Sequence, residues 1–168
     1  NLAFIRKATE GDAAYIQTHL PDTDDLTRQR AFVYGTVPVQ KILLEAGVNV
    51  NATPCFEGNL PNFPAWGYLE PHYGVSAHAT ATALLRACVM GNNEQARFLI
   101  QQGADVNIAG QLDDEPDKDT WLSVLDGSFA LWAAISKKNA PLMSMFLEAG
   151  ADVNWPQNLS LPYNALYA

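Results

Sequence analysis

The sequence has few cysteines and no long apolar run. Its 168 residues include two cysteines, Cys55 and Cys88, which are too few for a disulfide framework and suit a reducing compartment. No apolar stretch approaches the ~20 residues that a membrane-spanning helix requires. We therefore expect a cytoplasmic, intracellular protein that does not bind a membrane, with export as a secreted effector as the alternative.

Positive charge is also scarce, because ten Lys and Arg face eighteen Asp and Glu, for a net charge of −8. Such a chain repels phosphate backbones and anionic lipids, so nucleic-acid binding is not expected. Charged residues make up only 17% of the chain and hydrophobic residues 48%, a balance that excludes a disordered protein. A chain of this length can bury a core without disulfides or metals.

Signatures of catalysis are missing as well. We find no Gly-rich phosphate loop, no G-x-S-x-G elbow and no pair of carboxylates with catalytic spacing. The less favoured alternative is a metal site or a Cys–His nucleophile in residues 52–80, built from Cys55, His72 and His78, although their spacing matches no known motif. His19 is expected near the end of a surface helix. No enzyme activity, catalytic residue, cofactor or metal is therefore predicted.

What the chain does contain is an internal repeat, recognisable by a shared ending and a shared beginning. The ending has two apolar residues, two further residues, a glycine and a turn rich in Asp and Asn. It occurs at Leu43–Asn51, Leu99–Asn107 and Phe146–Asn154. The beginning is a run of small and apolar residues. It occurs at Thr82–Gly91 and Phe129–Lys138, with weaker copies at Leu26–Gly35, Ala8–Leu20 and Asn164–Tyr167.

This pattern resembles the ankyrin repeat, a unit of about 33 residues with two antiparallel helices and a projecting turn. The family's T-P-L-H-x-A opening survives partly, as Thr82–Ala87 and Phe129–Ala134, and its L-L-x-x-G-A-D-V-N ending survives better. The resemblance implies an all-α ankyrin-repeat solenoid, in which each unit must stack on its neighbours to bury its apolar face.

The repeated ending also has a direct physical interpretation. The paired apolar residues are expected to complete the inward face of the second helix. Gly47, Gly103 and Gly150 lie where that helix must stop, in the left-handed conformation that glycine tolerates. The Asp and Asn that follow are expected to bond nearby backbone amides. Ala87 and Ala134 are small enough to let neighbouring helices approach closely.

We expect one domain, in which two long insertions interrupt the units. The units lie approximately at residues 2–25, 26–51, 82–107 and 129–154, with a partial unit at 164–168 and insertions at 52–80 and 108–127. The first insertion is rich in proline, glycine and aromatic residues, so it is not a regular helix. Its rings either pack on the helices or face a partner. The acidic run 113–119 is either solvated surface or a lip that steers a basic partner.

The resemblance implies a protein–protein interaction module, a monomeric scaffold or adaptor whose partner is another protein or peptide. The alternative is a regulatory or targeting arm of a larger protein, such as an enzyme or a bacterial effector. In the ankyrin family, residues that close the first helix of each unit face a concave groove and vary with the partner. By register these are Val33, Tyr34, Val89, Met90, Ser136 and Lys137, with Thr9 and Glu10 in the first unit. The insertions add the aromatic candidates Phe63, Trp66, Tyr68 and Trp121. These groove positions are called the groove strip below. The alternative to a partner-facing groove strip is that the two insertions cover it and bury it inside the protein.

We also expect the parent coding sequence to be longer than these 168 residues. The chain starts at Asn1 instead of methionine, and its last repeat copy stops at Ala168 before a second helix can form. Determining the complete coding sequence tests this expectation. A reading frame that ended at Ala168 would contradict it.

Overall fold

The computed structural model describes residues 2–56, 79–80, 82–108, 111–112 and 130–153. Within these ranges the chain forms four pairs of α-helices, with a short 3-10 helix, η1 (Leu20–Asp22), after the first pair. The pairs are α1 (Leu2–Glu10) with α2 (Ala13–His19), α3 (Asp25–Tyr34) with α4 (Val37–Glu45), α5 (Ala83–Val89) with α6 (Asn93–Gln101), and α7 (Ala130–Ser136) with α8 (Ala140–Glu148).

Most of these helices begin at a polar residue that satisfies an otherwise unpaired backbone N–H of the first turn. In each case the side chain of the residue before the helix accepts a hydrogen bond from the backbone three residues later. These capping residues are Asp12, Asp24, Thr82, Asn92 and Asn139. The helix starts are therefore encoded locally, by single polar residues.

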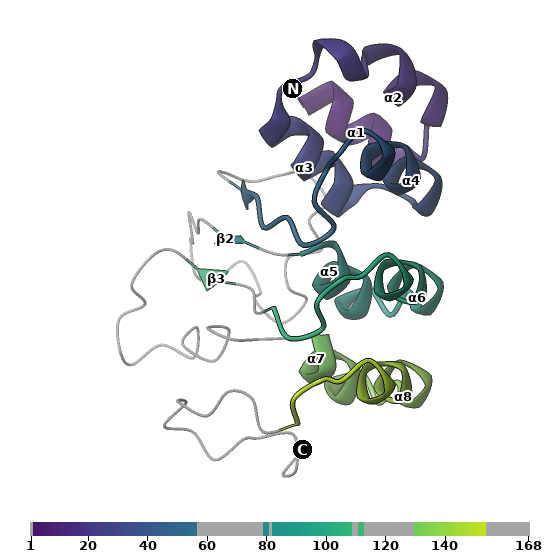
Figure 1. Ribbon diagram of the computed structural model, residues 1–168, viewed down its shortest axis with the longest axis vertical. Helices are drawn as coiled ribbons and strands as arrows, with labels where there is room; N and C mark the ends of the chain where they lie inside the picture. Colours follow the sequence, from purple (N-terminus) through teal and green to yellow (C-terminus); the bar gives the residue numbers. More distant parts are fainter. Residues whose placement is uncertain (1, 57–78, 81, 109–110, 113–129, 154–168) are drawn as a thin grey trace, which may run out of the picture.

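The pairs stack on one another in chain order along the long axis of the molecule (Figure 1). The first helices form one row, in which α1 packs against α3, α3 against α5 and α5 against α7. Among the second helices, α2 packs against α4 and α6 against α8. The all-α prediction is confirmed for this helical framework.

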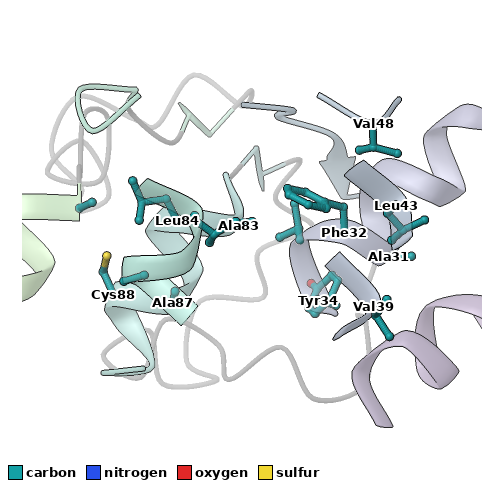
Figure 2. Packing of buried hydrophobic residues seen from close by; sticks show 14 of the residues in the cluster. Ala31, Phe32, Tyr34, Val39, Leu43, Val48, Ala83, Leu84, Ala87 and Cys88 are labelled. Carbon is teal, nitrogen blue, oxygen red and sulfur yellow. The ribbon is translucent and has the colours of Figure 1, made fainter. Parts of the chain in front are cut away.

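The core is shared between successive pairs. Each first helix contributes a fully buried alanine at the equivalent place: Ala8, Ala31, Ala87 and Ala134. Larger side chains fill the space around these alanines. Figure 2 shows Phe32 of α3 lying between α5 and α4. Because each apolar face is covered by a neighbouring pair, the stack and not the single pair is the unit of stability.

The helix endings follow the predicted chemistry. Gly47, Gly103 and Gly150 have φ of +88°, +85° and +83°, the left-handed conformation expected of them. In the turns that follow, the Asn49 side chain accepts a hydrogen bond from the Asn51 amide, and the Asp105 side chain accepts one from the Asn107 amide, each at 2.9 Å. The turn residues are therefore structural.

The paired apolar residues of the endings do not both face the core, contrary to the prediction. The first of each pair, Leu43, Leu99 and Phe146, is fully buried. Leu44 and Ile100 are only partly buried, and the side chain of Leu147 is 52% exposed. Successive residues of a helix point about 100° apart, so the second residue of a pair lies at the edge of the apolar face.

In addition to the helices, the described residues form three two-residue strands, which were not predicted from the sequence. β1 (Cys55–Phe56), β2 (Ala79–Thr80) and β3 (Gln111–Leu112) form an antiparallel sheet in that order. Cys55 is opposite Thr80 in β1 and β2, so the two ends of the first predicted insertion lie side by side. The remainder of both predicted insertions, residues 57–78, 109–110 and 113–127, lies outside the described residues.

Lys138 occupies the position in the fourth pair that Gly91 occupies in the third, and both have positive φ, +53° and +68°. A side chain in the left-handed region costs roughly 1 kcal/mol relative to glycine. We expect Lys138→Gly to raise the free energy of unfolding by up to about 1 kcal/mol, measured by urea denaturation.

Gly91→Ala is the matched opposite change, since a Cβ there would meet nothing within 4 Å and only the backbone conformation would be strained. It should lower the free energy of unfolding by about 1 kcal/mol. A Lys138→Gly variant less stable than the parent would contradict this account of the turn.

Candidate functional site

A pocket of about 380 Å³ opens where the first three helix pairs meet. Its wall is built from the end of α1, the α3–α4 connection, the end of α5 and the start of α6. The lining residues are Thr9, residues 34–38, Arg86, Met90, Asn92, Glu94 and Gln95. The pocket thus combines apolar, cationic and amide groups from three successive pairs.

Three positions of the predicted groove strip meet in this pocket, Thr9, Tyr34 and Met90. Met90 is 49% exposed, so its apolar side chain reaches solvent at the pocket. Tyr34 is only 5% exposed and forms part of the pocket wall. Packing of equivalent helices has therefore brought together residues that are far apart in the sequence.

The other predicted positions lie elsewhere. Val33 is fully buried in the core, so its side chain does not reach the pocket surface. Glu10 and Lys137 are exposed and do not line this pocket. The side chains of Val89 and Ser136 and the whole of Phe63, Trp66, Tyr68 and Trp121 lie outside the described residues.

Arg86 is the main charged group of the pocket wall. Its guanidinium carbon lies 5.1 Å from the centre of the Tyr34 ring, within cation–π range. Its Nε is buried and has no hydrogen-bond partner. Burial lowers the pKa of the Arg86 guanidinium, which stays charged at pH 7 because the ordinary pKa of arginine is so high. Burial raises the pKa of the Tyr34 phenol, so tyrosine stays neutral at pH 7.

A buried hydrogen bond fixes the wall between the second and third helix pairs. The Gln95 side-chain amide donates to the backbone carbonyl of Gly35 at 2.7 Å. Gly35 itself has no room for a side chain, because a Cβ there would lie 2.8 Å from the Ala31 carbonyl oxygen and 2.9 Å from Val39 Cγ1. The pocket wall at Gly35 is therefore closely packed.

The first turns of α4 and α6 both face the pocket, through residues 36–38 and through Asn92, Glu94 and Gln95. The N-terminus of a helix carries a partial positive charge from its aligned peptide dipoles. Glu94, which is exposed, is the acidic residue among the described lining groups. The wall is therefore positive at Arg86 and at two helix ends, and negative at Glu94.

The cysteine and histidine residues bear on the alternative of a metal or nucleophile site. Burial raises the pKa of Cys88, and this thiol stays protonated in the core. No group of three His, Cys, Asp or Glu side chains able to hold a metal occurs among the described residues. His19 ends α2 as predicted and stacks on Tyr15, with ring centroids 3.9 Å apart. The side chain of Cys55 and the whole of His72 and His78, which belong to the alternative metal or nucleophile site, lie outside the described residues.

Several pocket residues were not predicted from the sequence, above all Arg86, Pro38 and Gln95. Arg86 did carry a signal, since it is the charged residue inside the apolar helix Ala83–Val89. Gln95 lies on an amphipathic helix, and only its contact with a carbonyl 60 residues earlier in the sequence shows its role.

We expect Gln95→Leu to lower the free energy of unfolding by about 1–3 kcal/mol, because it removes the buried donor to the Gly35 carbonyl. Urea denaturation measures the change. Gln101→Leu, at an exposed position of the same helix, is the matched control and should leave stability nearly unchanged. Equal stabilities of the two variants would show that the bond does not hold the second and third pairs together.

No helix within the described ranges is long and apolar enough to cross a membrane.

Comparison with known proteins supports the repeat identified above. The family model for the ankyrin repeat matches residues 81–111, which include α5, α6 and the first residue of β3. No curated protein matches the chain. The matched segment supplies Arg86, Met90 and Gln95 to the pocket. The chain therefore contains an ankyrin repeat at residues 81–111. This repeat forms the part of the pocket wall that comes from the third helix pair.

Proposed function

We propose that this protein is an interaction module, an ankyrin-repeat solenoid that binds another protein or peptide and has no catalytic activity of its own. Ankyrin repeats mediate protein–protein interactions, and the match at residues 81–111 supports this class of function. The four helix pairs are taken as its units, close to residues 2–25, 26–51, 82–107 and 129–154, with insertions at 52–80 and 108–127. The observation that carries the proposal is the pocket in which Thr9, Tyr34 and Met90 converge from three pairs.

The proposed mechanism is docking on a preformed surface. The pocket walls are helix ends held by the shared core and by the Gln95–Gly35 hydrogen bond. A partner that binds such walls loses its own freedom but does not need to order the protein, which lowers the entropic cost of association. Met90 supplies exposed apolar area at the pocket edge, where contact with a partner would remove it from water.

The proposed contact surface centres on Met90 and the edge of Tyr34, with Thr9 beside them and Lys137 further along the stack. Ser136, Val89 and the aromatic residues of the insertions, Phe63, Trp66, Tyr68 and Trp121, remain predicted contacts. A basic partner remains the prediction for the acidic run 113–119, through charge attraction.

The test begins with selection of binding peptides from a random peptide display library on the immobilised chain. Met90→Asp should weaken binding of a selected peptide by about tenfold or more, because it places a charge on the apolar edge of the pocket. Fluorescence anisotropy of the labelled peptide measures the affinity. Tyr34 is less suitable for this test, since a charge at a buried position would destabilise the fold.

Leu147→Asp is the matched control, because Leu147 is exposed to a similar extent, 52% against 49% for Met90, and lies on α8 away from the pocket. It should leave the affinity unchanged. If both variants bind the peptide as well as the parent, the pocket is not the docking surface. Circular dichroism of each variant confirms that the helices are retained.

A further inference from the structure

Arg86 is a partly buried cation, and no described residue accepts a hydrogen bond from it or forms an ion pair with it. Among the described residues, its guanidinium lies over the face of the Tyr34 ring. Removing a cation from water is unfavourable unless an anion or several acceptors replace the lost hydration. A half-buried guanidinium in the wall of an open pocket is therefore a group that an incoming acceptor would stabilise.

The surroundings of Arg86 favour an anionic acceptor. α4 and α6 are helices of nine residues each, and their first turns line the same pocket. Their N-termini add a partial positive charge to it. The Tyr34 ring restricts the guanidinium from one side, so its planar set of donors is preorganised. Such a donor set matches the two oxygens of a carboxylate.

Apolar groups lie next to this cationic wall. Met90 is half exposed, and Val37 and Pro38 of the first turn of α4 line the same pocket. A ligand that fills the pocket must therefore place an apolar group beside its anionic group. A free small anion does not offer this combination, whereas an acidic side chain followed or preceded by an apolar side chain in a polypeptide does.

We infer that the pocket binds an aspartate or glutamate side chain of a partner polypeptide, with the carboxylate on Arg86 and a neighbouring apolar side chain of the partner on Met90. This inference rests on the proposed function and specifies the chemistry of the partner. A phosphorylated side chain fits less well, because Arg86 is the one basic side chain among the described lining residues and the acidic Glu94 lines the same pocket. Phosphate sites commonly use clusters of arginines. The acidic group proposed here is local, so the same partner can carry basic residues elsewhere.

The experiment uses peptides selected on the immobilised chain, and their affinities for the parent and for variants of it. We expect the selected peptides to share an acidic residue next to an apolar one. Arg86→Gln should weaken their binding by about tenfold or more, since a charge-assisted hydrogen bond is lost. Arg86→Lys keeps the charge but loses the paired donors, so its affinity for the peptides should lie between that of the parent and that of Arg86→Gln. Arg97→Gln, at an exposed position of α6, is the matched control and should bind like the parent.

Two further measurements identify the contact itself. Replacing the peptide's acidic residue by its amide should cause the same loss as Arg86→Gln, and combining both changes should cause little additional loss. Glu94→Gln should act in the opposite direction and strengthen binding, because it removes a negative charge from the pocket. Thermal unfolding of Arg86→Gln shows whether the fold is retained. If Arg86→Gln unfolds the protein, the contact is tested on the parent protein instead, by the loss of affinity when the acidic residue of the peptide is replaced by its amide.

The possible results separate this inference from the proposed function. Selected peptides without a common acidic residue, whose binding depends on Met90 but not on Arg86, would overturn the inference and leave the docking site intact. Tighter Arg86-dependent binding of the same peptide with phosphoserine in place of the acidic residue would also overturn it. Failure to select any peptide whose binding depends on Met90 or Arg86 would overturn both.

Discussion

The close packing of the first helices against one another is the constraint on which the rest of the molecule depends. Ala8, Ala31, Ala87 and Ala134 are fully buried at equivalent places along this row, and each allows the next helix to come near. A larger side chain at any of these positions would separate two pairs and expose the apolar faces of both. The pocket depends on the same spacing, because its three walls come from three successive pairs whose separation the alanines set.

Polar groups complement this apolar row by fixing how each pair is aligned with the next. The Asn51 side chain accepts a hydrogen bond from the Asp105 amide, and Asn107 accepts one from the Asp152 amide, each at 2.8 Å. At the opposite ends of the second helices, Asn93 and Asn139 exchange side-chain hydrogen bonds of 3.3 and 2.7 Å. Hydrophobic contact is nonspecific in direction, whereas these amide bonds require one alignment. Together they fix the alignment of the second pair with the third and of the third pair with the fourth.

Much of this framework could be predicted from the sequence, because its signals are local. Capping residues, the glycines at +83° to +88° and the turn residues each act within a few positions of the chain. What could not be predicted depends on contacts between distant residues. The burial of Val33, the exposure of Leu147 and the Gln95–Gly35 hydrogen bond follow from how neighbouring pairs cover each other. The candidate site was predicted through Tyr34 and Met90, but its charged member, Arg86, sits at a position that the ankyrin pattern leaves unspecified.

The pairing of β1 with β2 has a consequence for how the chain can vary. Because Cys55 lies opposite Thr80, the polypeptide departs from the stack and returns to it at adjacent points. In general, each doubling of the length of a connection between two fixed ends costs only about 0.6 kcal/mol more in closure entropy. We therefore expect residues added between these two strands to cost little stability, because the β1–β2 pairing holds both ends of the connection. We expect the connection between β1 and β2 to be a place where new binding surface can be added while the helical stack is kept.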